Sequence, residues 1–298
     1  MIDRRTLIVA GAALAAGCGA GRRGEPAPDE VAREASADFE AIRSTLGPGG
    51  RLGVAAIDTG SGRELRFDAD SLYPLASTFK LPLAAFILRL VERGELSLDE
   101  ELPFASGDPL DNSPTVEANR ALGRLPVRQL CAAIVEVSDN SAANILLRRT
   151  GGPAALTRFI RACGDPVTRL DRFEMELGSN LPGDPRDTTS SAAMAALVRK
   201  LVLGDVLTEE NRNRLQVWLK KSVPGPDRLK AGLPAPPWLI GHKTGTAANG
   251  GVNDVAIGWR SGKAPIVIAC YLSGGTAEPP ARFAAHASVG RLVAKVFA

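Results

Sequence analysis

Three short motifs in the chain carry side chains that could act on a carbonyl group. The first is Ser77-Thr78-Phe79-Lys80, which opens a run of apolar residues at helical spacing. Residues three apart share one face of a helix, so the Ser77 hydroxyl and the Lys80 amine can meet there. Backbone N–H groups at a helix N-terminus favour developing negative charge, and a buried amine loses affinity for its proton. The motif therefore predicts a serine nucleophile beside a basic lysine.

The other two motifs are Ser138-Asp139-Asn140, between two helical stretches, and Lys243-Thr244-Gly245-Thr246, on an expected strand. Each motif alone is weak evidence, because Ser, Asp and Asn commonly cap helices and Lys is a common helix residue. Gly245 removes a side chain at a point where a ligand could lie against the strand backbone. The three motifs together, in this order, are far more specific than any one of them.

Composition excludes several other chemistries. The chain has 298 residues, a net charge of +3 and only two histidines, His242 and His286. A zinc hydrolase with several His ligands is therefore not expected, and a Ser-His-Asp triad would need one of these two as its base. The near-neutral charge gives no argument for nucleic acid. Cys131, Cys163 and Cys270 lie in apolar contexts and are expected to be packing residues, without a metal or cofactor.

The first residues are interpreted as an export signal. Arg4 and Arg5 precede an apolar run from Leu7 to Ala20, which is too short for a membrane-spanning helix. This pattern is typical of a secretory signal with a twin-arginine start. Residues 14–18, Leu-Ala-Ala-Gly-Cys, resemble a bacterial lipoprotein cleavage site, which would make Cys18 the lipidated N-terminus. The alternative is an ordinary signal peptide in which Cys18 is incidental, leaving a periplasmic or extracellular protein.

The order of patterns along the chain predicts an α/β fold. Strand patterns lie near both ends, at 53–57, 64–67, 238–242, 252–259 and 265–272. Helical patterns fill the middle and flank both ends, at 31–46, 78–93, 126–137, 141–150, 153–163, 189–203, 208–219 and 281–297. We expect a mixed, antiparallel-rich sheet built from both chain ends, flanked by helices, with an inserted all-α domain. The expected divisions are a signal at 1–18, a linker at 19–37, an α/β domain at 38–68 and 221–298, and a helical domain at 69–220.

The combined motifs resemble those of class A serine β-lactamases. Residues 172–189, from Arg-Phe-Glu-Met-Glu-Leu to Asp-Pro-Arg-Asp-Thr-Thr, resemble the omega loop of that family, placed at 172–187. Residues 231–234, Ala-Gly-Leu-Pro, and Asn253-Asp254 match further family patterns. The similarity covers about residues 39–297 and implies the β-lactamase/DD-peptidase-like fold, with a small-molecule β-lactam as substrate and a monomeric chain.

This resemblance also implies roles for individual residues. Ser77 would attack the lactam carbonyl, with the backbone N–H groups of Ser77 and Thr246 as the oxyanion hole. Ser138 would pass a proton to the lactam nitrogen, beside Lys80 and Lys243, and Glu174 would activate the hydrolytic water. Whether Lys80 or Glu174 takes the first proton from Ser77 stays open.

The resemblance further assigns residues to binding and support. Asn140 would bind the acylamino side chain of the substrate. The substrate carboxylate would be bound by Lys243, Thr244, Gly245, Thr246 and Arg228. Arg228 matches an alternative arginine of some members, since no arginine follows Asn253-Asp254. Arg172 and Asp187 would close the omega loop and hold Glu174.

The sequence departs from the family pattern at several positions. Ala76 stands where many members have Cys, and His242 replaces a usual Asp. Gly178 takes the place of an asparagine that helps to hold the deacylating water, and Asn180 lies two residues further on. Asn112 stands where an aromatic residue often flanks the pocket. These differences bear on deacylation and on the substrate spectrum.

Two alternative functions share some of these motifs. A DD-peptidase-like penicillin-binding protein would be acylated but would deacylate slowly. A β-lactam-binding lipoprotein without hydrolytic activity is the other. The segment around Glu174 favours hydrolysis, because penicillin-binding enzymes generally lack it.

Overall fold

The computed structural model describes residues 28–298 with the exception of residues 106, 108 and 109. The export-signal and Cys18 interpretations lie outside the described residues. Among the described residues, no helix combines the length and the apolar character needed to cross a membrane.

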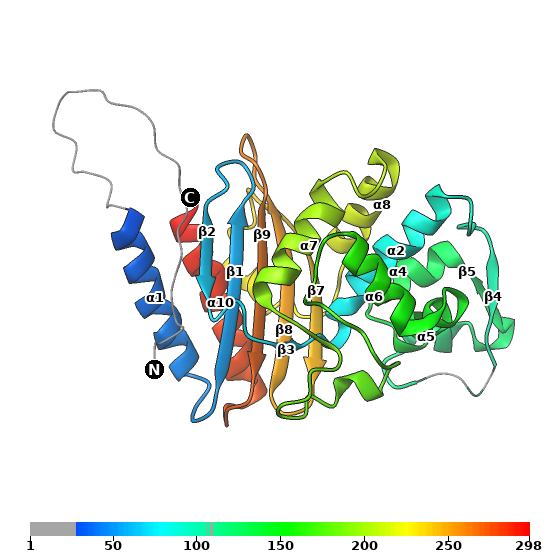
Figure 1. Cartoon of the computed structure of the whole chain (residues 1–298), viewed down its shortest axis with the longest axis horizontal. Helices are drawn as coiled ribbons and strands as arrows, with labels where there is room; N and C mark the ends of the chain where they lie inside the picture. Colours follow the sequence, from blue (N-terminus) through cyan, green and yellow to red (C-terminus); the bar gives the residue numbers. More distant parts are fainter. Residues whose placement is uncertain (1–27, 106, 108–109) are drawn as a thin grey trace.

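A five-stranded antiparallel sheet forms the centre of the fold, in the order β2-β1-β9-β8-β7 (Figure 1). Its strands are β1 (Arg51–Asp58), β2 (Glu64–Phe67), β7 (Leu239–Ala247), β8 (Gly251–Trp259) and β9 (Ile266–Ser273). Hairpins connect β1 to β2, β7 to β8 and β8 to β9, and β1 pairs with β9 along its whole length. The sheet is built from both chain ends, as expected, but it is antiparallel throughout rather than mixed, because hairpins reverse the chain at these connections.

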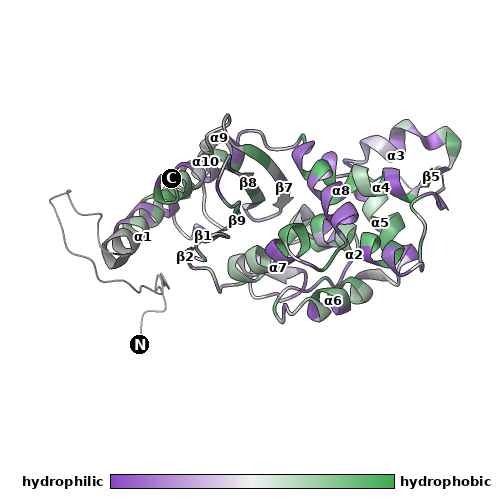
Figure 2. Ribbon diagram, turned by 90° about the horizontal axis from the view of Figure 1, so that it is seen from above, coloured by the Kyte–Doolittle hydropathy of each residue, from purple (hydrophilic) through white to green (hydrophobic). Residues whose placement is uncertain are grey.

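The helices lie on both faces of the sheet and beyond one edge (Figures 1 and 2). They are α1 (Pro28–Ser44), α2 (Lys80–Glu92), α3 (Pro114–Ala118), α4 (Val127–Glu136), α5 (Asn140–Arg149), α6 (Gly152–Ala162), α7 (Ser191–Leu203), α8 (Glu209–Lys220), α9 (Leu229–Gly232) and α10 (Pro279–Val296). Three short 3₁₀ turns are η1 (Ala76–Phe79), η2 (Arg120–Leu122) and η3 (Glu176–Gly178). Two small ribbons pair β3 (Tyr73–Pro74) with β6 (Thr188–Thr189) and β4 (Glu101–Pro103) with β5 (Arg124–Pro126).

Side chains alternate between the two faces of each strand, and the sheet has a hydrophobic core on either face. In β9, Ile268 and Cys270 face the core that α1 and α10 cover, whereas Ala269 and Tyr271 face the core that the other helices share. Successive side chains of a strand point to opposite faces, so a strand that is apolar throughout can bury both. The sheet is therefore held between a two-helix layer and the larger helical region.

The expectation of a linker as far as residue 37 is wrong, because α1 begins at Pro28. The helix buries Ala35 and Phe39 against the sheet, and Ile42 packs on the same core. The apolar residues recur at intervals of three to four positions, as on one face of a helix. Their burial stabilises a helix that begins before the first of them.

Candidate active site

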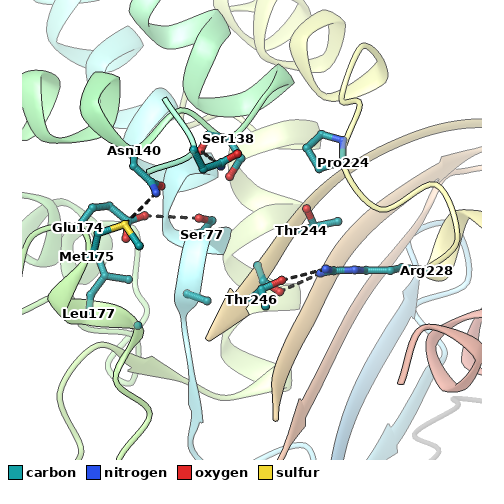
Figure 3. A pocket seen from close by; sticks show the side chains of 14 residues that line it. Ser77, Ser138, Asn140, Glu174, Met175, Leu177, Pro224, Arg228, Thr244 and Thr246 are labelled. Carbon is teal, nitrogen blue, oxygen red and sulfur yellow. Dashed lines mark hydrogen bonds between the residues drawn. The ribbon is translucent and has the colours of Figure 1, made fainter. Parts of the chain in front are cut away.

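An open cavity of about 370 Å³ lies where the helical region meets β7, the edge strand of the sheet (Figure 3). Its walls come from segments far apart in the chain: Ser77, Ser138 and Asn140, Glu174, Met175, Leu177 and Gly178, Pro224 and Arg228, and Thr244 to Thr246. All three motifs from the sequence therefore meet at one place, together with the loop that carries Glu174.

The Ser77 side chain projects into this cavity from η1, directly before α2. Its Oγ accepts a hydrogen bond from Lys80 Nζ at 3.0 Å and lies 3.4 Å from Glu174 Oε1. The turn packs tightly against β7, because a Cβ on Gly245 would lie 3.1 Å from Ser77 N and 3.0 Å from Ala76 Cβ. The turn that carries Ser77 thus occupies the space that a side chain at Gly245 would need, and Gly245 also lines the cavity.

Lys80 is fully buried and lies at the centre of the polar cluster. Besides Ser77, its Nζ contacts Ser138 O at 2.8 Å, Asn140 Oδ1 at 2.5 Å and Glu174 Oε1 at 3.0 Å. Burial lowers the pKa of Lys80, and the nearby Glu174 carboxylate opposes that shift. The Ser77 hydroxyl, the Lys80 amine and the Glu174 carboxylate therefore lie in mutual contact, and both Lys80 and Glu174 are placed to exchange a proton with Ser77.

Ser138 stands between the two lysines. Its Oγ accepts a hydrogen bond from Lys243 Nζ at 3.0 Å and lies 3.5 Å from Lys80 Nζ. Burial and the charge of Lys80 place the pKa of Lys243 well below its usual value. Lysine, serine and lysine thus form a continuous polar path along one wall of the cavity.

The next residues of that motif serve both structure and site. Asp139 caps α5 by accepting a hydrogen bond from Ala142 N at 2.8 Å. Asn140 faces the cavity, where its Nδ2 donates to Asp111 O at 2.7 Å and lies 3.1 Å from Met175 Sδ. The capping role and the proposed binding role therefore occur side by side in one motif.

The loop at 172–187 is closed by Arg172 and Asp187. Arg172 Nε donates to Asp187 Oδ2 at 2.6 Å, and the other oxygen of this buried carboxylate accepts from Asp171 N at 2.7 Å. Asn144 holds Glu174 from a second side, because its Oδ1 accepts from Glu174 N and its Nδ2 donates to Glu174 O. The sequence analysis missed Asn144, although it lies four residues after Asn140 and so shares a face of α5 with it.

Gly178 lines the cavity, and a Cβ on it would meet no atom within 4 Å. Asn180 does not reach this space. Its Nδ2 donates to Ala248 O at 2.7 Å, and its backbone O accepts from Asn249 Nδ2 at 2.9 Å. Asn180 therefore ties the loop to the turn between β7 and β8.

Arg228 is buried behind the far end of the cavity and presents its guanidinium to β7. Its Nη2 donates to Thr246 Oγ1 at 2.9 Å (Figure 3), while Nη1 donates to Gly245 O and Asn253 O, each at 2.8 Å. Lys243 and Thr244 precede Thr246 on the same strand. This end of the cavity therefore combines fixed positive charge with hydroxyl groups, which suits a carboxylate.

Two residues outside the three motifs, Asn112 and Met175, also line the cavity. Asn112 donates to Ser138 O at 3.0 Å, and Met175 is a cavity residue that sequence reasoning missed.

Cys131 and Cys270 are buried, Cys163 is half-buried, and all three are free. Among the described residues, no group of three or more His, Cys, Asp or Glu could hold a metal ion.

This combination of fold and cavity defines a serine hydrolase with a lysine at its nucleophile. A family model described as "Beta-lactamase enzyme family" matches residues 36–297, and the chain belongs to this family. It is 43% identical to beta-lactamase AST-1 of Nocardia asteroides over 90% of this chain and 87% of that protein. It is 40% identical to beta-lactamase L2 of Stenotrophomonas maltophilia over 97% of both.

Solved structures agree with this assignment. An ancestral (GNCA) class A β-lactamase, representing the last common ancestor of Gram-negative bacteria, superimposes with a TM-score of 0.85. That structure is 46% identical, and the match covers 88% of this chain and 99% of that one. The chain is a class A β-lactamase, an enzyme that hydrolyses the β-lactam amide and confers antibiotic resistance.

Proposed function

We propose that the chain hydrolyses penicillin- and cephalosporin-type β-lactams through an acyl-enzyme on Ser77. The observation that carries this proposal is the position of the Ser77 hydroxyl, which projects into the cavity within reach of both Lys80 Nζ, at 3.0 Å, and Glu174 Oε1, at 3.4 Å. A weakly acidic hydroxyl needs an adjacent base to become a nucleophile, and this one has two.

In the first half-reaction, Ser77 Oγ forms a bond to the lactam carbonyl carbon and gives its proton to Lys80 or Glu174. The backbone N–H groups of Ser77 and Thr246 receive the developing oxyanion. The C–N bond then breaks, and Ser138 donates a proton to the departing nitrogen while the neighbouring lysines restore it. The path from Lys80 through Ser138 to Lys243 supports this sequence of proton transfers.

In the second half-reaction, Glu174 takes a proton from a water molecule that attacks the ester carbonyl. The C–O bond to Ser77 breaks, and the serine oxygen regains a proton. The clamp from Asn144 and the closure by Arg172 and Asp187 support this role, because they hold the Glu174 carboxylate over Ser77.

Substrate binding follows from the remaining walls of the cavity. We assign the substrate carboxylate to Lys243, Thr244, Thr246 and Arg228, with Gly245 allowing the strand to approach Ser77. The acylamino side chain is assigned to Asn140. We place the cavity between the α/β domain (38–68 and 221–298) and the helical domain (69–220).

The experiment that tests this function is the progress curve of nitrocefin hydrolysis by the native chain. Many equivalents hydrolysed per equivalent of enzyme are expected. A single stoichiometric burst would instead favour the slowly deacylating penicillin-binding alternative, and no reaction with Ser77 would favour a binding protein without activity.

Replacing Gly178 by Asn is expected to raise the deacylation rate for some substrates. The added amide would enter open space at the cavity wall and could hydrogen-bond the attacking water. Single-turnover measurements across a penicillin, a cephalosporin and a carbapenem provide the test, with Gly178→Ala as the control that adds bulk without an amide. Unchanged deacylation rates for all three substrates would refute this expectation.

We infer that the chain is exported as a monomer and held at the membrane through a lipid on Cys18. The support is sequence alone: paired arginines, a short apolar run and a lipobox-like Cys18. Metabolic labelling with palmitate is expected to mark the full chain and to leave Cys18→Ser unlabelled. A native chain without label would contradict the anchor and leave a periplasmic or extracellular enzyme.

A further inference from the structure

A buried pair of titratable side chains lies on the sheet face opposite Lys243 and takes no part in the proposed reaction. His242 on β7 and Asp254 on β8 point into the core beneath α9 and α10, where each is at most 1% exposed. His242 Nδ1 lies 3.1 Å from Asp254 Oδ1 and 3.2 Å from Asp254 Oδ2. Burying a carboxylate costs free energy unless the carboxylate is paired, so packing alone does not account for Asp254 at this position.

Asp254 is connected to the carboxylate end of the cavity by hydrogen bonds. Its Oδ2 accepts from Leu229 N at 3.1 Å, which fixes the turn immediately after Arg228. Arg228 in turn spans β7 and β8 by donating to Gly245 O and Asn253 O, and reaches Thr246 Oγ1. One carboxylate therefore anchors the segment from which the guanidinium enters the cavity wall.

Asp254 also balances charge. Lys80 has an ion-pair partner in Glu174, whereas within the described ranges no carboxylate forms a direct ion pair with Lys243 or Arg228. Burial lowers the pKa of both of these cations, and the charge of Asp254 acts against that lowering. Asp254 thus stabilises two neighbouring positive charges that burial would otherwise disfavour.

The other groups that face the pair from the surrounding elements do not supply this negative charge. Cys270 faces it from β9, and burial raises the pKa of its thiol far above the usual value. His286 faces it from α10, and burial lowers its pKa to about 4, so it is neutral at pH 7. Asp227 acts on Arg228 only as a secondary influence after Asp254.

We propose that Asp254, paired with His242, is a positioning residue for the carboxylate-binding end of the cavity. It holds the Arg228–Leu229 turn in place and provides the negative charge that lets Arg228 and Lys243 stay charged together. This inference rests on the proposed function, because it assumes that Arg228 and Lys243 bind the substrate carboxylate.

Asp254→Asn is the central test. Asparagine keeps an acceptor for Leu229 N–H and can still hydrogen-bond His242, so the variant removes charge with little change in packing. We expect KM for benzylpenicillin to rise about tenfold, with kcat changed less. The alkaline limb of kcat/KM should move to lower pH, by about one unit, because Lys243 loses the carboxylate that favours its charged form. Cys270→Ala, in the same layer, is the uncharged control.

Two further variants keep the inference falsifiable if Asp254→Asn folds poorly. Asp254→Glu retains the charge and should restore the alkaline limb even at a lowered thermal midpoint. His242→Asn also leaves the Asp254 charge in place and should keep the native alkaline limb. A shift in His242→Asn as large as in Asp254→Asn would overturn the charge argument, as would an Asp254→Asn enzyme with native KM and pH profile.

Arg228→Gln separates failure of this inference from failure of the proposed function. If Arg228→Gln raises KM while Asp254→Asn leaves it unchanged, the carboxylate site stands and the role of Asp254 falls. If Arg228→Gln leaves KM unchanged as well, the assumed carboxylate site is itself wrong. In the double variant, a KM increase smaller than the product of the single effects is the coupling that a positioning role predicts.

Discussion

Replacement of Glu174 by alanine is expected to leave the enzyme trapped as an acyl-enzyme on Ser77. The carboxylate lies close to the Ser77 hydroxyl and is held by Asn144, so its removal takes away the base for the attacking water. General-base catalysis contributes up to about 10⁴-fold, and we expect deacylation to slow by that order. Intact-mass spectrometry after mixing with a penicillin should show one covalent adduct that persists.

The exposed Glu176 offers a matched control, because it lies on the same loop two residues away. Glu176→Ala should turn over penicillin at close to the native rate. Normal turnover by Glu174→Ala would show that another group activates the water. The acylation rate of the same variant also addresses the first proton transfer, since rapid acylation without Glu174 would leave Lys80 as the base.

Replacement of Lys80 by methionine is expected to abolish acylation itself. Lys80 Nζ contacts Ser77, Asn140 and Glu174 at once, so methionine removes the donor to the nucleophile and leaves the Glu174 carboxylate without its cation. We expect the acylation rate to fall about 10²- to 10⁴-fold, the range for a lost acid–base group. Rapid-quench mass spectrometry should then show no early adduct, in contrast to Glu174→Ala.

The control for this second variant is Lys263→Met, at an exposed turn of the sheet. It removes the same charge from the chain and should acylate normally. Thermal unfolding of Lys80→Met establishes that the variant is folded before its rates are compared. A Lys80→Met enzyme that acylates at the native rate would assign the first proton to Glu174 alone.

Much of the fold could be predicted because its determinants are local. The strand pattern at 265–272 and the helix pattern at 189–203 lie within two residues of the observed β9 and α7. The helical pattern at 31–46 begins three residues after the observed start of α1, whereas the linker expected as far as residue 37 is wrong, because the burial of Phe39 against a sheet formed by distant strands stabilises the helix. The antiparallel pairing of β1 with β9 likewise joins opposite ends of the chain.

The site residues could be proposed because their motifs are short and ordered, whereas their partners could not. Asn144 and Asp254 act through contacts with residues that are distant in sequence, such as Glu174 and Leu229. Gly245 shows the same limit, since the Ser77 turn, which is distant in sequence, lies where a side chain at Gly245 would be. Motifs identify the chemistry, and tertiary contacts decide how it is held.

The most direct test of the central claim is the progress curve of nitrocefin with the native chain and a known concentration of enzyme. We expect continuous hydrolysis far beyond one equivalent, because Glu174 activates the water that hydrolyses the Ser77 acyl-enzyme in each cycle. A burst of one equivalent followed by no further hydrolysis would contradict it.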